Sequence, residues 1–116
     1  MPYVDGFVAA VPEGKRDLYL SHAAFMAPLF RENGALRVVE CWGDDVPEGK
    51  VNSFHTAVLR KEGEVVVFSW VEWPDKATRD AGWAAMMADP RMQDGGETAF
   101  DGQRLIYGGF GVILEG

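Results

Sequence analysis

The sequence predicts a ferredoxin-like α+β fold, a β-α-β-β-α-β sandwich in which a four-stranded antiparallel sheet carries two helices on one face. Three observations predict it. Segments with strand and helix periodicity follow one another in that order. A length of 116 residues suits one domain, residues 1–116. The third strand segment is apolar on both faces, although two helices can cover only one face of a sheet.

The second face of the sheet therefore needs another cover. No remaining segment of the chain supplies one, so the economical arrangement is a second copy of the sheet, packed face to face about a two-fold axis. We predict a homodimer, in the form of a dimeric α+β barrel.

The first strand and the first helix occupy the amino-terminal third of the chain. Residues 3–11 are rich in Val, Phe, Tyr and Ala and end at turn residues, which predicts a strand. Residues 15–33 repeat apolar side chains at three- and four-residue spacing, which predicts a helix. Pro28 removes one backbone donor inside this helix, so we expect a kink or break at residues 24–27.

Two more strands and a loop follow. Residues 35–42 predict the second strand, and residues 43–50 have the composition of an exposed loop that extends to about residue 55. Residues 64–73 predict the third strand most strongly, because β-branched and aromatic residues occupy both alternating faces.

The second helix and the last strand complete the fold. Asp75 is the expected N-cap of a helix that Asp89 and Pro90 end. An alanine-lined face of this helix is expected to pack on the sheet; it comprises Ala77, Ala81, Ala84 and Ala88. Residues 94–96 predict a turn, and residues 105–114 predict the last strand.

Charge and cysteine content limit the classes of function. Eleven Lys and Arg against 18 Asp and Glu give a formal charge of -7, which disfavours nucleic acid as a partner. The single cysteine, Cys41, excludes a disulfide within the chain and fits a cytoplasmic protein. The sequence shows neither an export signal nor an apolar run long enough to span a membrane.

Five segments resemble the YbaA-like family of small bacterial proteins of unknown function. They are residues 3–8, 34–47, 68–74, 89–92 and 100–110, and the run Cys41-Trp42-Gly43-Asp44-Asp45 is their most specific part. The resemblance spans nearly the whole chain and implies the dimeric α+β barrel superfamily fold, in agreement with the pattern of elements. It implies no reaction and no catalytic residues.

Alternation along each strand groups the residues that share a face. The groups are Tyr3, Asp5, Phe7 and Ala9; Leu36, Val38, Glu40 and Trp42; Val66, Phe68, Trp70 and Glu72; and Leu105, Tyr107 and Gly109. We expect all four groups to lie on the face away from the helices. Asp5, Glu40 and Glu72 would then share an apolar space between subunits, where a carboxyl group can exchange protons near neutral pH.

Each candidate site has a structural alternative. A one-residue bulge would move a carboxylate to the other face, and Asp5 and Glu72 could instead be solvated strand ends or partners of Arg37 and Arg104. The aromatic residues Trp42, Trp70 and Tyr107 could line a pocket for a flat apolar ligand, but aromatic residues also fill cores and dimer interfaces.

Metal and cofactor sites have little support in the sequence. His22 and His55 could each ligate a metal or haem, but neither has a partner at metal-ligand spacing. Cys41 is expected to be a buried, unreactive thiol. No glycine-rich phosphate loop precedes a helix, and nothing in the sequence requires a cofactor.

Two functional hypotheses follow. The first is a homodimeric protein that binds or transforms an apolar or aromatic small molecule, with Asp5, Glu40 and Glu72 as the catalytic groups and Trp42, Trp70 and Tyr107 as ligand contacts. The alternative is a non-catalytic dimeric module whose sheet face is used in self-association and whose acidic exterior contacts another protein. An open, carboxylate-lined cavity would favour the first, and a close-packed interior would favour the second.

Overall fold

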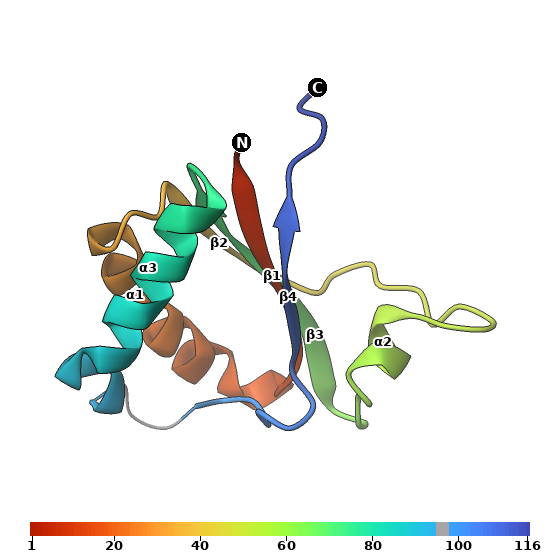
Figure 1. Cartoon of the computed structure of the whole chain (residues 1–116). Helices are drawn as coiled ribbons and strands as arrows, with labels where there is room; N and C mark the ends of the chain where they lie inside the picture. Colours follow the sequence, from red (N-terminus) through yellow and green to blue (C-terminus); the bar gives the residue numbers. More distant parts are fainter. Residues whose placement is uncertain (95–97) are drawn as a thin grey trace.

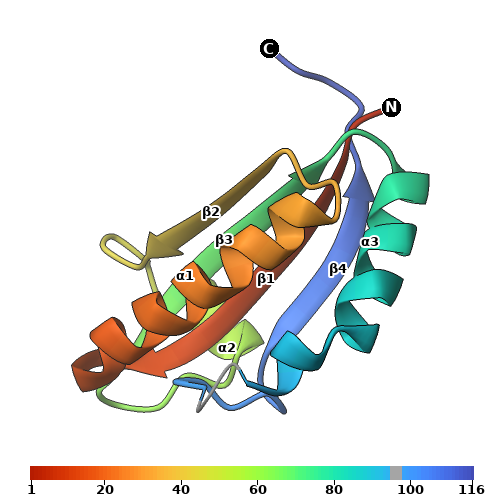
Figure 2. The same cartoon turned by 90° about the vertical axis from the view of Figure 1, so that its left-hand side faces the viewer.

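The computed structural model describes residues 1–94 and 98–116. The elements in chain order are β1 (Tyr3–Pro12), η1 (Glu13–Lys15), α1 (Arg16–Glu32), β2 (Arg37–Trp42), α2 (Phe54–Ala57), β3 (Glu64–Trp73), α3 (Lys76–Ala88), η2 (Pro90–Gln93) and β4 (Ile106–Gly111). The four-stranded sheet has the order β2-β3-β1-β4, and every neighbouring pair is antiparallel. Helices α1 and α3 lie on one face of this sheet (Figures 1 and 2), which confirms the predicted ferredoxin-like α+β sandwich.

β1 and α1 lie where the sequence predicted the first strand and the first helix, and no end differs from the prediction by more than one residue. The expected break at Pro28 is absent, since α1 runs without interruption to Glu32 (Figure 2). Pro28 and Ala24 are both on the exposed side of the helix. Water can therefore hydrogen-bond the Ala24 carbonyl that lost its donor, and the helix tolerates the proline.

The face opposite to α1 and α3, which we call the outer face, is covered at one end by residues around α2. A capping box between Ser53 and Thr56 begins this short helix, in a stretch where the sequence indicated only a loop. Val58, just after α2, is fully buried in a cluster with Val8, Ala10 and Val66. Figure 1 shows α2 on the side of the sheet away from α1 and α3.

The strand registers correct the expected distribution of side chains between the two faces. Direct partners in an antiparallel sheet share a face, and Asp5 lies opposite Val71, while Glu40 lies opposite Ser69. Of the four groups expected on the outer face, only that of β3 lies there. The groups from β1, β2 and β4 occupy strand positions on the helix side instead, except that the exposed side chains of Leu36 and Tyr107 border the outer face. Because β1 is apolar on both faces, its alternation carries no information about which face the helices cover.

Helix α3 begins at the predicted N-cap, but it packs with a different side than the predicted alanine face. The Asp75 carboxylate accepts a hydrogen bond of 2.7 Å from the Thr78 backbone N–H, which confirms the N-cap. The four alanines expected to face the sheet are exposed, and Gly82 and Met86 are buried. A Cβ on Gly82 would lie 2.8 Å from the Asn33 carbonyl oxygen, so the glycine permits a close approach of the two helices.

The carboxyl-terminal region contains a shorter strand than expected. β4 ends at Gly111, and the following residues Ile113 and Leu114 are almost fully exposed. Of the turn expected at residues 94–96, residues 95 and 96 lie outside the described part of the chain. Within the described ranges, no helix is long and apolar enough to cross a membrane.

Candidate functional site

The three carboxylates expected to converge lie in three different environments. Asp5 and Glu40 face the helices, and Glu72 lies on the outer face. The expectation of one shared carboxylate cluster is therefore wrong. It depended on the strand faces, which the alternation of the sequence left undetermined.

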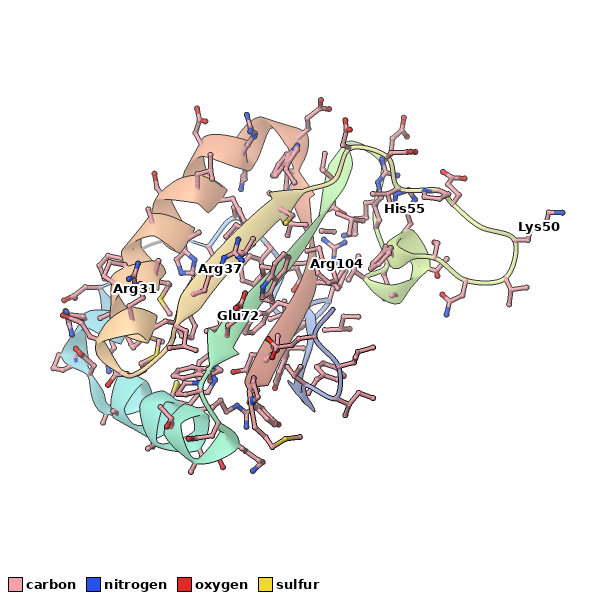
Figure 3. All side chains as sticks on the ribbon, turned by 90° about the horizontal axis from the view of Figure 1, so that it is seen from above. Arg31, Arg37, Lys50, His55, Glu72 and Arg104 are labelled. Carbon is pink, nitrogen blue, oxygen red and sulfur yellow. The ribbon has the colours of Figure 1, made fainter. Side chains whose placement is uncertain are left out.

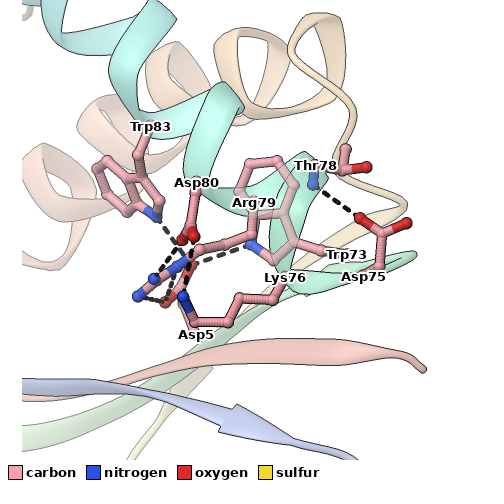
Figure 4. A network of polar contacts seen from close by, with 8 residues as sticks. All are labelled: Asp5, Trp73, Asp75, Lys76, Thr78, Arg79, Asp80 and Trp83. Carbon is pink, nitrogen blue, oxygen red and sulfur yellow. Dashed lines mark hydrogen bonds and ion pairs between the residues drawn. The ribbon is translucent and has the colours of Figure 1, made fainter.

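Asp5 is a buried structural anchor between β1, β3 and α3. Its carboxylate accepts hydrogen bonds from Trp73 Nε1 at 3.0 Å, from Trp83 Nε1 at 2.8 Å and from the Arg79 guanidinium, whose Nη2 is 2.8 Å away (Figure 4). Each carboxylate oxygen accepts at least two of these bonds, and Asp5 is 3% exposed. The lone pairs of the carboxylate are thus used within the fold.

Arg79 has two further contacts besides its hydrogen bonds to Asp5. Its guanidinium also pairs with Asp80 at 2.9 Å and lies over the Tyr3 ring at 5.2 Å. The hydrogen bonds from Arg79 to Asp5 raise the pKa of Arg79 above its ordinary value. The guanidinium therefore remains a cation that balances the buried carboxylate.

Glu72 forms an ion-pair network on the outer face. It accepts a hydrogen bond from Trp70 Nε1 at 2.8 Å, and Arg37 Nη1 lies 3.7 Å from its carboxylate. Figure 3 shows Arg37 and Glu72 on the neighbouring strands β2 and β3. The alternative that paired Glu72 with Arg37 is thereby confirmed, whereas Arg104 pairs with Glu64.

A cavity of about 150 Å³ lies between the helices and the sheet; we call it the helix-side cavity. Apolar and aromatic side chains form most of its wall, including Phe7, Met26, Phe30, Val71, Trp83 and Phe100. Its polar side chains are Tyr19 and His22 from α1, Glu40 from β2 and Ser69 from β3. A largely apolar cavity with a few converging polar groups is the usual form of a small-molecule site.

Glu40 and Tyr19 are directly hydrogen-bonded at this cavity, with the Tyr19 hydroxyl as donor. Burial raises the pKa of Glu40, while hydrogen bonds from Tyr19 and Ser69 act in the opposite direction. Burial also raises the pKa of Tyr19, and its bond to Glu40 raises it further. Tyr19 therefore keeps its proton at neutral pH, and Glu40 is the group of this pair that can gain or lose one.

His22 contributes a neutral imidazole to the same cavity. Burial lowers its pKa from the ordinary value of 6.5. Its ring meets Phe100 edge to face at 6.4 Å, and Tyr19 meets the same ring at 6.3 Å. Tyr19 and His22 are three residues apart on α1, so they point toward one side of the helix.

The sequence analysis named Glu40 and did not assign Tyr19, His22 and Ser69 to a common site. Ser69 carried a usable signal, because it is the one hydroxyl residue in the apolar strand from Val65 to Val71. It occupies a position buried against the helices. Buried hydroxyl groups need partners, so such a serine indicates polar neighbours across the core.

Of the three aromatic residues expected to surround one ligand, Trp70 and Tyr107 line one groove on the outer face, and Trp42 lies apart from them. Trp42 faces the helices on β2, with Arg16 over its ring at 5.7 Å. Trp70 lies on the outer face beside Phe68, with ring centroids 5.9 Å apart. Tyr107 lies on the edge strand β4 and is 75% exposed. The separation of Trp42 from the other two follows from the same undetermined strand faces.

The outer face carries a broad apolar groove of about 810 Å³, which we call the outer groove. Phe68, Ile106 and Phe110 line it and are between 42% and 63% exposed. Glu72 and Glu115 are its acidic groups. Exposed apolar surface of this kind marks an interaction site.

Neither histidine joins a cluster that could hold a metal. Residues 1–94 and 98–116 contain no group of three His, Cys, Asp or Glu side chains with suitable placement. His55 lies in α2 (Figure 3), and its Nδ1 atom is buried and makes no hydrogen bond within the described residues. Cys41 is exposed rather than buried, because its strand lies at the edge of the sheet.

The architecture and the cavity define the class: a ferredoxin-like α+β protein with a small cavity between its helices and its sheet. A dimeric ferredoxin-like protein from an uncultured marine organism shares the fold, with a TM-score of 0.62, 15% identity and 99% of each chain covered. Rv0793 from Mycobacterium tuberculosis is similar with a TM-score of 0.51 and 14% identity, over 99% of this chain and 98% of that one.

Residues 2–102 match the model of a family described as a protein of unknown function (DUF1428), and the chain belongs to this family. It is 59% identical over 116 residues to the uncharacterized protein YbaA of Escherichia coli strain K12, with 99% of each chain covered. YbaA of Shigella flexneri matches equally well. These matches confirm the resemblance to the YbaA-like family.

Glu40→Gln is expected to gain stability relative to the wild-type protein as the pH rises from 4 to 8. A raised pKa in the folded state means that ionisation of Glu40 favours the unfolded chain, so its contribution to stability is lost at higher pH. Glutamine cannot ionise and can still accept from Tyr19. Because Glu40 is partly open to solvent, we expect a gain of at most about 1 kcal/mol at pH 8.

Urea denaturation of both proteins between pH 4 and pH 8 measures this difference. Glu62→Gln, at an exposed position, is the control and should show no such trend. A loss of stability in Glu40→Gln at pH 8 would contradict the prediction and identify the carboxylate as a structural partner.

Proposed function

We propose that the protein is a homodimeric small-molecule-binding protein whose apolar or aromatic ligand occupies the helix-side cavity. The observation that carries the proposal is the Tyr19–Glu40 pair, set in a cavity whose other walls are mainly apolar. The single cysteine and the acidic composition support a cytoplasmic location and a partner other than nucleic acid.

The size of the cavity supports a compact ligand. An engineered apolar cavity of similar volume, about 150 Å³, binds benzene in another protein. A ligand built on one six-membered ring therefore matches the helix-side cavity. Glu40 lines the cavity and is also partly open to solvent on the edge strand β2, which supplies a route for a ligand from solvent.

Of the three carboxylates considered, Glu40 is the one that lines this cavity. We therefore assign to Glu40 the proton exchange that a reaction on the ligand would need, with Tyr19 as a hydroxyl donor that stays protonated. Asp5 and Glu72 are assigned no contact with the ligand, since both are bonded within the fold.

Toluene is a suitable first probe, because it is one apolar ring. We expect it to shift the NMR signals of residues that line the helix-side cavity. Ala23→Leu should abolish these shifts, because Ala23 lines the cavity and a larger side chain fills it. Ala24→Leu is the matched control, since Ala24 is the next residue on α1 and is exposed.

Two results would contradict ligand binding at this place. One is the absence of any effect of toluene on the wild-type protein. The other is equal binding by Ala23→Leu and the wild type. Either result would favour the alternative of a dimeric module without a ligand site.

The outer groove supports the homodimer. Its apolar side chains come from three strands, β1, β3 and β4, so a partner that covers it would contact most of this face of the sheet. Standard interfaces bury about 800 Å² of accessible surface on each partner. A second copy of the same sheet has a matching apolar face and can close both grooves at once. The neighbour of similar fold that is described as dimeric adds support.

Phe68→Glu is expected to convert the dimer into a folded monomer. Phe68 lies on the internal strand β3, so a two-fold interface would place two introduced carboxylates in one apolar contact region. Size-exclusion chromatography with light scattering should show a mass near 12.8 kDa for the variant and twice that for the wild type. Circular dichroism verifies that the variant is folded.

Met87→Glu is the control, because Met87 is an exposed apolar residue on α3, away from the outer face. It should remain dimeric. A wild-type protein that is monomeric at all concentrations, or a Phe68→Glu variant that remains dimeric, would refute the proposed interface.

A further inference from the structure

Three of the four polar side chains described at the helix-side cavity, Tyr19, Glu40 and Ser69, form one cluster, and His22 lies one helical turn from Tyr19. The Tyr19 hydroxyl donates to Glu40, and Ser69 is the direct cross-strand partner of Glu40. Ser69 lies close enough to both side chains to lower the pKa of each. The walls formed by Phe7, Met26, Phe30 and Trp83 offer only ring and aliphatic surface. A ligand that fills this cavity therefore meets hydrogen-bonding groups at one place.

The charges around the cluster disfavour ionic ligands. The described residues that line the cavity include no Lys or Arg, so an anionic ligand would lack a counter-ion beside Glu40. His22 is neutral at pH 7 and does not supply one. An ammonium group would have to lose its water within a mainly aromatic cavity in which Glu40 offers the one carboxylate among the described lining residues.

A hydroxyl group matches the cluster best. The single proton of Tyr19 is already donated to Glu40, but a ligand hydroxyl can donate to the Glu40 carboxylate or to the lone pairs of the Tyr19 oxygen, and it can accept a hydrogen bond itself. Tyr19 already shows that Glu40 accepts a hydrogen bond from a hydroxyl in this cavity. A ligand without a polar group would leave the cluster as it is and gain nothing from it.

On this basis we infer that the helix-side cavity is selective for a single ring that bears one uncharged hydroxyl group, a phenol being the simplest, and that Tyr19 and Glu40 recognise this hydroxyl. The inference rests on the proposed function, because it requires that the cavity binds a ligand. It adds the chemical class of that ligand and the residues that select it.

Four probes with a common ring test this selectivity at pH 7. They are toluene, p-cresol, p-toluate and 4-methylbenzylamine, which differ in one substituent and in its charge. Dissociation constants are measured by NMR titration of the full-length protein. We expect p-cresol to bind at least about tenfold more tightly than toluene, and both ions to bind more weakly than p-cresol.

Variants connect the preference to the two residues. In Tyr19→Phe and in Glu40→Gln, the ratio of the p-cresol and toluene affinities should fall several-fold, while the toluene affinity stays the same. Retained toluene binding also proves that each variant is folded. Glu72→Gln removes a carboxylate from the opposite face of the sheet and should leave the ratio unchanged.

The outcomes separate this inference from the proposed function. Equal affinities for p-cresol and toluene, or tightest binding of either ion, would overturn the selectivity and leave ligand binding in place. A preference for p-cresol that persists in both variants would overturn the roles of Tyr19 and Glu40. Failure of all four probes to bind would overturn the proposed function and the inference with it.

Discussion

Replacement of Asp5 by asparagine is expected to lower the free energy of unfolding by about 3–5 kcal/mol. The substitution removes the charge that balances Arg79, and it places an amide NH₂ group among the indole N–H donors of Trp73 and Trp83. Arg79 then keeps only the exposed Asp80 as a partner, and unsatisfied donors remain in a region where Asp5 itself is 3% exposed. Urea denaturation, followed by circular dichroism at one fixed protein concentration, measures the loss.

Asp80→Asn is the matched control for this experiment. Asp80 pairs with the same guanidinium at 2.9 Å, but its side chain is 48% exposed. Its replacement should therefore cost much less than that of Asp5. Equal losses in the two variants would refute the special role of the buried carboxylate.

The Asp5 anchor also bears on the proposed ligand site. Trp83 donates to Asp5 and lines the helix-side cavity. Its ring meets Phe30, another wall of the cavity, edge to face at 5.2 Å. A variant that releases the indole of Trp83 should therefore weaken toluene binding even under conditions where the protein stays folded.

Glu64→Gln is expected to lower the free energy of unfolding by about 2–3 kcal/mol at pH 7. Arg104 forms two hydrogen bonds of 2.7 Å to the Glu64 carboxylate, and the two side chains are 9% and 13% exposed. Arg104 also donates to the Leu59 carbonyl, so the pair connects the start of β3 with two loops. Figure 3 shows Arg104 among the side chains around this end of the sheet.

The stability difference between the wild type and Glu64→Gln should depend on pH. The hydrogen bonds from Arg104 lower the pKa of Glu64 from 4.5 to about 2. A carboxyl whose pKa is depressed by folding stabilises the folded state above its ordinary pKa and loses that contribution as the pH falls. The difference between wild type and Glu64→Gln should therefore be full at pH 7, shrink below about pH 4.5 and vanish near pH 2.

Urea midpoints at pH 7, 5, 4 and 3 measure this trend for as long as both proteins remain folded. Glu62→Gln, two residues away and exposed, should match the wild type throughout. A stability difference between Glu64→Gln and the wild type that does not change with pH would contradict a role of the ionised carboxylate.

The local order of elements was predictable from the sequence because its signals are local. β3 has the predicted bounds Glu64–Trp73, since ten residues of β-branched and aromatic character between turn signals are typical of a strand. α1 and the Asp75 N-cap follow from helical spacing and from one side chain that caps its own turn. The short helix α2 escaped prediction because four residues carry too little periodicity.

The candidate site was only partly predictable. Glu40 was recognised as an unusual carboxylate within an apolar strand, but its partner Tyr19 lies 21 residues away on a helix. Asp5 was grouped with Glu40, although Trp83, which holds it, is 78 residues away. Such pairs depend on how the helix layer packs on the sheet, and no local pattern contains that information.

The amino-acid sequence by itself determined the element types, their order and therefore the α+β class, because backbone hydrogen bonding and side-chain periodicity act over a few residues. Only the tertiary structure decided which face of β1 and β2 the helices cover. That choice is made by the whole core at once, since a strand with apolar residues on both sides satisfies either orientation. It separated Glu72 from Glu40 and placed Glu40 beside Tyr19 in the helix-side cavity.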